Sequence, residues 1–313
     1  MMRNIIFWLS TKKAVTSTIA DRGMRYGFAR RFVAGESLDE ALMASAALGR
    51  ESRKVSLNFL GENVTTKDEA RRVRANYIEM LQGLERDKID GNISIKLTQL
   101  GLDIDRELCT QLTLEIAAAA KALHRDIEAD MEASAYTDAT LDIFENVRRQ
   151  YDNIGLAVQA YLYRTEKDIE RLAPLNPKLR LVKGAYREPA TIAWQKKSEV
   201  DANYRRLIDL LFDGRFYPAI ATHDALMQEH ALLRIRERSV RPENYEFQMI
   251  YGIRRDLQES IQSGGHPVRI YVPFGSDWCP YFMRRLSERP ANCGFVLRSL
   301  VAETFRSNRN AGA

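Results

Sequence analysis

Along the chain, short runs of apolar, β-prone residues alternate with longer stretches in which apolar residues recur every three or four positions. A short apolar run predicts a buried strand, whereas the three-and-four spacing predicts one apolar face of a helix. The predicted strands are 55–60, 92–97, 126–131, 155–161, 179–183, 217–222, 245–251 and 269–273. Because strands alternate with helices, we expect parallel pairing through right-handed crossovers. Eight such repeats predict an α/β fold of the (β/α)8 TIM-barrel type.

Polar residues mark the points where several predicted helices begin. Thr66 is followed three residues later by Glu69, and Ser37 by Glu40. This is the spacing of a capping box, in which each side chain accepts a hydrogen bond from the other residue's backbone N–H. Thr137 opens a further predicted helix. Others are predicted at 105–123, 189–213 and 224–238, and the connections after the fourth and seventh strands are shorter.

The principal alternative to a barrel is an open, doubly wound sheet. Such a sheet usually carries a glycine-rich phosphate-binding turn after its first strand, whereas here that strand runs into GENVTT, with a single glycine. A length of 313 residues by itself suggests two domains. Because no linker or biased segment divides the chain, we predict an N-terminal helical segment at 1–54 and one catalytic barrel at 55–313.

Composition and charge exclude several classes of protein. Hydrophobic residues make up 45% and charged residues 28%, as in soluble globular proteins. A net charge of +5 without a concentrated basic stripe argues against nucleic-acid binding. The three cysteines have no disulfide-like or metal-like spacing, which indicates a reducing compartment. The apolar run at 5–9 is too short for a signal peptide and no stretch is long enough to span a membrane, so we expect a cytoplasmic protein.

The carboxyl ends of the strands are where the active site of a (β/α)8 barrel lies. The residues expected there are Lys96, Asp130, Glu132, Gln159, Arg180, Lys183, Thr222, His223, Asp224, Glu246 and Gln248, from the second to the seventh strand. Each of them alone is more often structural. Charged groups inside a core are costly unless they are paired, so their convergence indicates an anionic ligand. No second histidine stands at ligand spacing from His223, so no metal site is predicted.

Seven segments of the chain carry most of the polar residues expected at the strand ends: SIKLTQLGL (94–102), DMEASAYTDATL (130–141), GLAVQAYLYRT (155–165), LRLVKGAYREP (179–189), ATHD (221–224), EFQMIYGIRRDL (246–257) and RIYVPFGSDWCPYFMRRLSERPANCGFV (269–296). These segments resemble those of the proline dehydrogenases, the FAD-dependent enzymes that oxidise L-proline. They stand in the family's order, and the last, with its Y-x-x-R-R core, is the most specific. The chain most resembles the short monofunctional bacterial type. This resemblance implies a distorted barrel that binds FAD non-covalently.

By this resemblance, one group of residues binds proline. Arg284 and Arg285 would clamp the proline carboxylate, a task that suits guanidinium groups because they donate two parallel hydrogen bonds. Lys96 would stand near the same carboxylate and pair with Asp130, the family's active-site aspartate. The resemblance places Tyr186, Leu257 and Tyr281 around the substrate.

A second group of residues would hold the flavin. Arg180 would lie beside flavin N5, where a cation stabilises the reduced cofactor, and Lys183 would meet the phosphates. The other implied flavin contacts are Met131, Gln159, Gly184, Ala185, Thr222 and His223. Hydride would pass from proline C5 to flavin N5 and leave Δ1-pyrroline-5-carboxylate, the first step of proline catabolism to glutamate. The amine proton would go to Asp130 or to solvent.

The resemblance also implies partners: a quinone as electron acceptor, hence transient contact with the inner face of the plasma membrane, and a pyrroline-5-carboxylate dehydrogenase in the same pathway. The sequence departs from the family pattern at Asp224, Ala133 and Cys279, where Asn, an acidic residue and an aromatic residue are common. Two alternatives stay open. One is another flavin barrel, such as a methylenetetrahydrofolate reductase-like enzyme, and the other is a non-catalytic barrel that binds a carboxylate.

Overall fold

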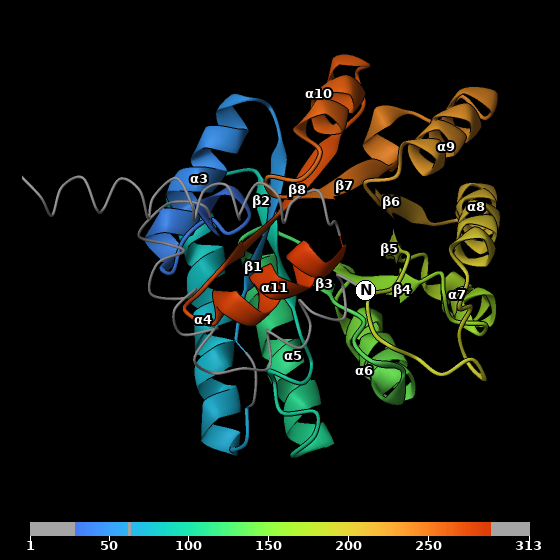
Figure 1. Cartoon of the computed structure of the whole chain (residues 1–313). Coiled ribbons are helices and arrows are strands. Elements are labelled where there is room, and N and C mark those ends of the chain that lie inside the picture. Colours follow the sequence, from blue (N-terminus) through green and yellow to red (C-terminus); the bar gives the residue numbers. More distant parts are fainter. Residues whose placement is uncertain (1–28, 62–63, 289–313) are drawn as a thin grey trace, which may run out of the picture.

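Eight parallel strands form the centre of the molecule. The computed structural model describes residues 29–61 and 64–288, with the backbone alone for 284–288. The strands pair in sequence order, and β8 also pairs with β1, so the sheet closes into a barrel (Figure 1). They are β1 Lys54–Phe59, β2 Gly91–Ile95, β3 Ile127–Ala129, β4 Ile154–Gln159, β5 Lys178–Val182, β6 Tyr217–Ala221, β7 Glu246–Ile250 and β8 Val268–Phe274. The prediction of a (β/α)8 barrel is therefore confirmed, with all eight predicted strands present.

Helices connect the strands and surround the barrel (Figure 1). They are α3 Leu38–Arg50, α4 Lys67–Arg86, α5 Arg106–Ala122, α6 Thr137–Gln150, α7 Thr165–Leu172, α8 Lys197–Asp213, α9 Ala225–Glu237, α10 Arg255–Ser263 and α11 Trp278–Glu288, with 3-10 turns η1 Ala29–Arg31, η2 Ser134–Tyr136, η3 Ala173–Leu175 and η4 Pro242–Asn244. Both predicted capping boxes are present, at Ser37 before α3 and at Thr66 before α4. Of the predicted N-terminal helical segment 1–54, residues 1–28 lie outside the described residues.

The predicted helix 189–213 is wrong at its start, because α8 begins only at Lys197. Ala193 instead forms an isolated antiparallel bridge with Leu162. Trp194 packs edge-on against Tyr163, with their ring centroids 4.5 Å apart. These contacts bind the segment 189–196 to the connection between β4 and α7, and they leave it irregular.

The strand residues alternate between the surrounding helices and the barrel interior. The residues that face the helices, such as Leu57, Ile93 and Leu181, are fully buried and apolar. The inward positions carry Ser56, Asn58, Asn92, Ser94, Glu128, Arg180, Glu246, Gln248, Arg269 and Tyr271, many of which hydrogen-bond one another. Bulky aliphatic residues usually fill this space in such barrels. A polar interior is costly to build, so it points to a function.

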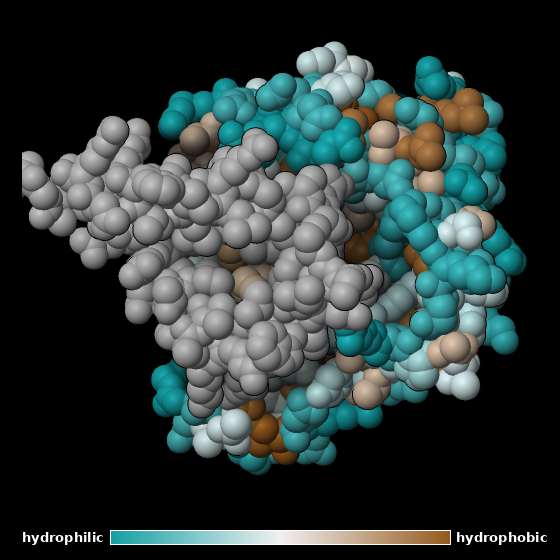
Figure 2. Space-filling model, in the orientation of Figure 1, coloured by the Kyte–Doolittle hydropathy of each residue, from teal (hydrophilic) through white to brown (hydrophobic). Residues whose placement is uncertain are grey.

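The last described helix, α11, crosses in front of the strands in the view of Figure 1. Its Trp278 and Phe282 pack together with Phe32, which precedes α3. On the same side, Figure 2 shows a largely hydrophilic described surface with hydrophobic residues visible inside a recess. None of the helices among the described residues is both long enough and apolar enough to cross a membrane.

Candidate active site

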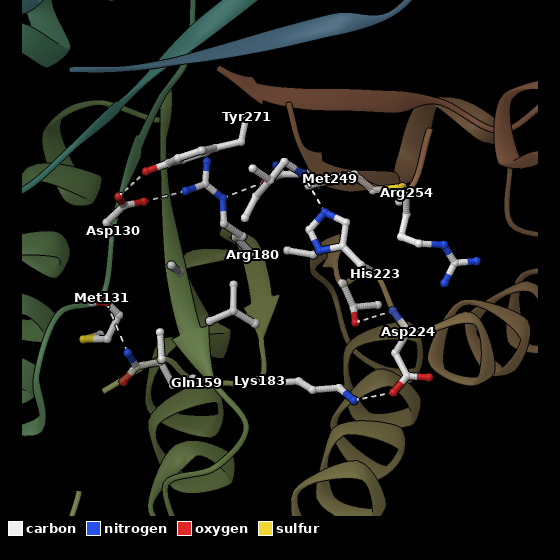
Figure 3. A pocket seen from close by; sticks show the side chains of 18 of the residues that line it. Asp130, Met131, Gln159, Arg180, Lys183, His223, Asp224, Met249, Arg254 and Tyr271 are labelled. Carbon is white, nitrogen blue, oxygen red and sulfur yellow. Dashed lines mark hydrogen bonds and ion pairs between the residues drawn. The ribbon is translucent and has the colours of Figure 1, made fainter. Parts of the chain in front are cut away.

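A pocket of about 720 Å³ opens at the carboxyl ends of the strands (Figure 3). This is the end at which (β/α)8 barrels carry their active sites, and the volume is in the range of small-molecule sites. Residues from β2 to β8 and from the connections that follow them form the lining. The polar lining residues are Lys96, Asp130, Gln159, Arg180, Lys183, Tyr186, Thr222, His223, Asp224, Gln248, Arg254, Tyr271 and Tyr281.

Asp130, which follows β3, is the centre of a hydrogen-bonded cluster in this pocket. Lys96 Nζ lies 2.6 Å from its Oδ2, and Arg180 Nη1 lies 2.6 Å from its Oδ1. The hydroxyls of Tyr271 and Ser94 donate to the same two oxygens, at 2.8 and 2.6 Å. Burial by itself would raise the pKa of Asp130, but the charges of Lys96 and Arg180, with these hydrogen bonds, lower it to about 2. The carboxylate therefore stays ionised at neutral pH.

Lys96 is held from both its backbone and its side chain. Its backbone N–H donates to the Tyr77 hydroxyl at 3.1 Å, and its ammonium also donates to Asn58 Oδ1 at 2.8 Å. Burial opposes the charge on Lys96, but Asp130 outweighs this effect and raises the pKa of the lysine well above its ordinary value. Two residues after Lys96, the backbone N–H and hydroxyl of Thr98 donate to Glu132, which lies in the connection after β3. The ammonium is thus fixed in place and remains protonated.

Tyr271 is a residue of this cluster that the sequence analysis did not single out. It lies in the middle of β8, on the inward face, and the Arg180 guanidinium lies over its ring at 5.2 Å from the centroid. Its hydroxyl donates a hydrogen bond to Asp130, and burial raises the pKa of Tyr271 far above the ordinary tyrosine value. The predicted strand 269–273 already contained Tyr271 at an inward position. The polar hydroxyl of an inward tyrosine was the signal that could have indicated its place in the site.

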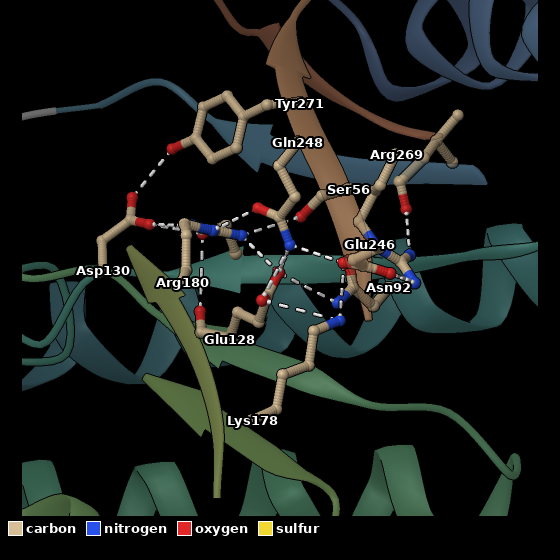
Figure 4. A network of polar contacts seen from close by, with 12 residues as sticks. Ser56, Asn92, Glu128, Asp130, Lys178, Arg180, Glu246, Gln248, Arg269 and Tyr271 are labelled. Atoms are coloured by element: carbon tan, nitrogen blue, oxygen red, sulfur yellow. Dashed lines mark hydrogen bonds and ion pairs between the residues drawn. The ribbon is translucent and has the colours of Figure 1, made fainter. Parts of the chain in front are cut away.

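Beneath this cluster lies a second layer of buried charges, drawn in Figure 4. Arg180 donates to Glu128 and to Gln248 Oε1, so its guanidinium is held on three sides when Asp130 is included. Gln248 Nε2 bonds in turn to Glu128, at 3.0 Å, and to Glu246, at 2.6 Å. The orientation of Arg180 is therefore set by the barrel interior and needs no ligand.

Glu246 is not at the mouth, where the sequence analysis placed it. It is the first residue of β7, at the opposite end of that strand from the pocket. There it forms a two-pronged ion pair with Arg269, at 2.8 and 3.0 Å, and a further pair with Lys178 at 2.8 Å. The predicted strand 245–251 already had Glu246 near its amino-terminal end, so the mistake was to assign both polar residues of that strand to the pocket mouth.

Two polar lining residues outside the Asp130 cluster, Gln159 and His223, have defined hydrogen-bond partners. Gln159 is buried, its Nε2 donates to the carbonyls of Met131 and Glu132, and its Oε1 has no hydrogen-bond partner among the described residues. His223 Nε2 accepts a hydrogen bond from the backbone N–H of Ile250 at 2.8 Å. That bond places the proton of the neutral imidazole on Nδ1.

Gly184 shapes the turn that leaves β5. Its φ is +111°, and a Cβ there would come within 2.3 Å of the Tyr161 ring. Only glycine adopts this backbone conformation readily, so a bare stretch of main chain borders the pocket at this point. Lys183, just before it, extends its ammonium to Asp201 and Asp224, at 2.5 and 2.7 Å.

Most residues predicted for the site line this one pocket. They are Lys96, Asp130, Met131, Gln159, Arg180, Lys183, Gly184, Ala185, Tyr186, Thr222, His223 and Tyr281. Leu257, on α10, is not among the lining residues and packs partly buried against the main core. Arg284 and Arg285 stand on α11, and their side chains lie outside the description. In the described part of the chain, no three His, Cys, Asp or Glu side chains gather as a metal site would require.

The closed parallel barrel and the charged pocket at its carboxyl end define a protein of the (β/α)8-barrel enzyme class. The chain belongs to the proline dehydrogenase family, whose model matches residues 41–298. It is 36% identical over 301 residues to proline dehydrogenase 1 of Bacillus subtilis subsp. natto. The alignment covers 96% of this chain and 99% of that protein. It is also 36% identical to a proline dehydrogenase of Deinococcus radiodurans, over 90% of this chain and 92% of the relative.

Solved structures support the fold. Proline utilization A from Bdellovibrio bacteriovorus, inactivated by N-propargylglycine, superposes with a TM-score of 0.78 at 24% identity. The match covers 83% of this chain and 32% of that larger protein. The chain therefore has the same barrel as one part of a longer polypeptide.

Proposed function

We propose that the chain oxidises L-proline to Δ1-pyrroline-5-carboxylate with FAD as a non-covalently bound cofactor. Membership of the proline dehydrogenase family supports the reaction. The observation that carries the proposal furthest is the buried cluster in which Asp130 binds Lys96, Arg180 and Tyr271 at the floor of the pocket. Such a cluster presents fixed positive and negative charges to a small zwitterion, which has a carboxylate and an ammonium of its own.

Substrate binding falls to residues around this cluster. In the proposal, Arg284 and Arg285 bind the proline carboxylate, and Lys96 adds a third cation beside them. Tyr186 and Tyr281, which line the pocket, enclose the ring of the substrate, and Leu257 is left out of this wall because it packs against the core. A clamp on the carboxylate fixes the position of C5, so that much of the catalysis is positioning.

The pocket suits a flavin dinucleotide in three respects. The buried Oε1 of Gln159 lacks a donor among the described residues, and the flavin ring carries an N–H group that can supply one. The Gly184–Ala185 backbone is bare enough for close approach by a phosphate, and Lys183 precedes it. Arg180 provides a fixed cation for the redox-active ring. We assign the remaining contacts to Met131, Thr222 and His223.

When bound, FAD would accept the hydride from C5 of proline together with its electron pair. The C5–H bond breaks while the nitrogen lone pair forms the C=N bond, so the amine must already have lost a proton. Asp130 is a weak base, because its pKa lies near 2, and Lys96 is protonated. We therefore assign the amine proton to solvent. The role of Asp130 is to hold Lys96, Arg180 and Tyr271 in one arrangement.

The fate of the electrons and of the product completes the proposal. Family resemblance supports a quinone as the electron acceptor, with transient contact at the inner face of the plasma membrane. It also supports a pyrroline-5-carboxylate dehydrogenase as the enzyme that consumes the product, in a cytoplasmic setting.

Anaerobic titration of the purified protein tests this function. We expect a yellow protein whose flavin absorption is bleached by L-proline. Arg180→Met should slow that bleaching strongly, whereas the matched change Arg171→Met, at an ion pair on α7 away from the pocket, should leave it unaltered. A colourless protein that FAD cannot reconstitute, or a yellow protein that L-proline does not bleach, would contradict the proposal.

A further inference from the structure

Four charged side chains at one rim of the pocket form a closed ring of alternating sign. Lys183 Nζ contacts Asp201 at 2.5 Å and Asp224 at 2.7 Å. Lys197 contacts the same two carboxylates, at 3.1 Å in the case of Asp224. The ring ties the end of β5 to the first turns of α8 and to the residue before α9. Two cations and two carboxylates leave it with no net charge.

Asp224 has a second contact that matters here. Its Oδ1 accepts a hydrogen bond from the backbone N–H of Leu226 at 3.2 Å, so it caps the first turn of α9. The amino-terminal end of a helix attracts anions, because its N–H groups lack partners within the helix. One carboxylate thus occupies both groups on this rim that would bind a phosphate: the ammonium of Lys183 and the end of α9. Figure 3 shows Lys183 and Asp224 paired in this way at the edge of the pocket.

Neighbouring charges keep this carboxylate ionised. Burial alone would raise the pKa of Asp224, but hydrogen bonds to Lys183 and Lys197 lower it to about 2. Asp224 is therefore negative at any pH at which the enzyme would work. Its side chain is 21% exposed, and it lines the pocket together with Lys183.

We propose that Asp224 limits the affinity of the pocket for the cofactor, because its carboxylate competes with the phosphate oxygens of the dinucleotide for Lys183 and for the end of α9. Asp201 contributes to this competition, because it binds the same ammonium group of Lys183. This inference rests on the proposed function. Cofactor binding then requires the ring to open or to share its lysine with a phosphate, and each course weakens an ion pair that the ligand-free protein already has.

The substitution Asp224→Asn removes the negative charge of this residue and keeps its role as the cap of α9. Asn caps helices about as well as Asp, so α9 keeps its first-turn hydrogen bond while the ring loses one negative charge. We expect the dissociation constant of FAD, measured on apoprotein by quenching of flavin fluorescence, to fall by about tenfold at low salt. The gain should shrink as salt is added, because the ring is partly exposed. Asp201→Asn should act in the same direction.

Two controls give the experiment its specificity. Asp209→Asn, on the same helix α8, removes a carboxylate that binds Arg234 and His230 instead of the pocket lysine, so FAD affinity should not change. Riboflavin lacks phosphate, and its affinity should not rise in Asp224→Asn. The melting temperature of each apoprotein shows whether a variant is folded.

The possible results distinguish a failure of this inference from a failure of the proposed function on which it rests. Tighter FAD binding in Asp224→Asn, absent in Asp209→Asn and for riboflavin, supports it. Unchanged or weaker FAD binding in Asp224→Asn would overturn it; a loss of affinity would instead indicate that the carboxylate accepts a ribose hydroxyl. If wild-type apoprotein bound no FAD at all, the proposed function would fall and this inference with it.

Discussion

At the scale of single residues, Tyr271 offers the sharpest test of the Asp130 cluster. Tyr271→Phe removes the hydroxyl that lies 2.8 Å from Asp130 Oδ2 and leaves the ring beneath Arg180. A hydrogen bond to a charged group contributes about 1.5–3 kcal/mol, so we expect kcat/KM for L-proline to fall about tenfold with flavin content unchanged. Tyr136→Phe is the control, because its hydroxyl also donates to a carboxylate, that of Asp103 at 2.9 Å, but outside the pocket. Equal activity of Tyr271→Phe and wild type would exclude this role.

The paired arginines of α11 make a separate prediction at the same scale. Arg284→Lys and Arg285→Lys each keep a positive charge but lose the planar fork that grips a carboxylate through two hydrogen bonds. We expect the KM for L-proline to rise about tenfold or more in each variant, measured by steady-state kinetics. Arg171→Lys should behave as wild type. If both clamp variants kept the wild-type KM, the carboxylate would have to be bound elsewhere.

At the scale of elements, the turn after β5 depends on Gly184. Gly184→Ala places a Cβ against the Tyr161 ring and forces alanine to φ +111°. Such strain costs about 1–3 kcal/mol, so we expect a lower free energy of unfolding and less bound flavin. Gly49→Ala in α3 is the matched control, because a Cβ there meets no atom within 4 Å; in a helix it should be neutral or stabilising. Urea denaturation and the flavin-to-protein absorbance ratio report both effects, and wild-type values for Gly184→Ala would refute the argument.

The elements themselves show what local sequence can specify. The strands were predictable because their helix-facing positions carry apolar, β-prone residues such as Leu57, Ile93 and Leu181. Helices α3 and α4 were predictable because their capping residues stand at the required spacing. The segment 189–196 was not, because what keeps it out of α8 is its bridge to Leu162 and the packing of Trp194 on Tyr163. These partners lie about thirty positions away in the sequence, so no local pattern predicts the contacts.

At the scale of the whole molecule, the site arises from where the barrel brings strand ends together. Closure of the sheet was inferred from eight repeats, and it places Lys96, Asp130 and Arg180 in one pocket without any further assumption. What could not be inferred is the partner of each inward side chain. Glu246 and Tyr271 show why: their partners, Arg269 and Asp130, come from other parts of the barrel, and no pattern within one strand specifies them.

The polar interior also determines how the protein responds to acid. Asp130, Glu128 and Glu246 are buried, which opposes ionisation, yet their cationic partners lower the pKa of all three. A carboxyl group with a lowered pKa stabilises the folded state above its unfolded pKa of about 4 and loses this effect as the pH falls towards its folded pKa. Asp126, Glu132 and Asp168, whose pKa values burial raises, act in the opposite direction. They are outnumbered, because further carboxyl groups such as Asp201 and Asp224 also have lowered pKa values.

We therefore expect the free energy of unfolding to be nearly constant between about pH 7 and 5, and to fall steeply below about pH 4. Urea denaturation of the flavin-loaded protein at several pH values, followed by circular dichroism, measures it. Added salt should restore little of the loss, because buried ion pairs are poorly screened. Equal free energies of unfolding at pH 7 and pH 3 would mean that the buried carboxylates do not hold the barrel together through their ionised forms.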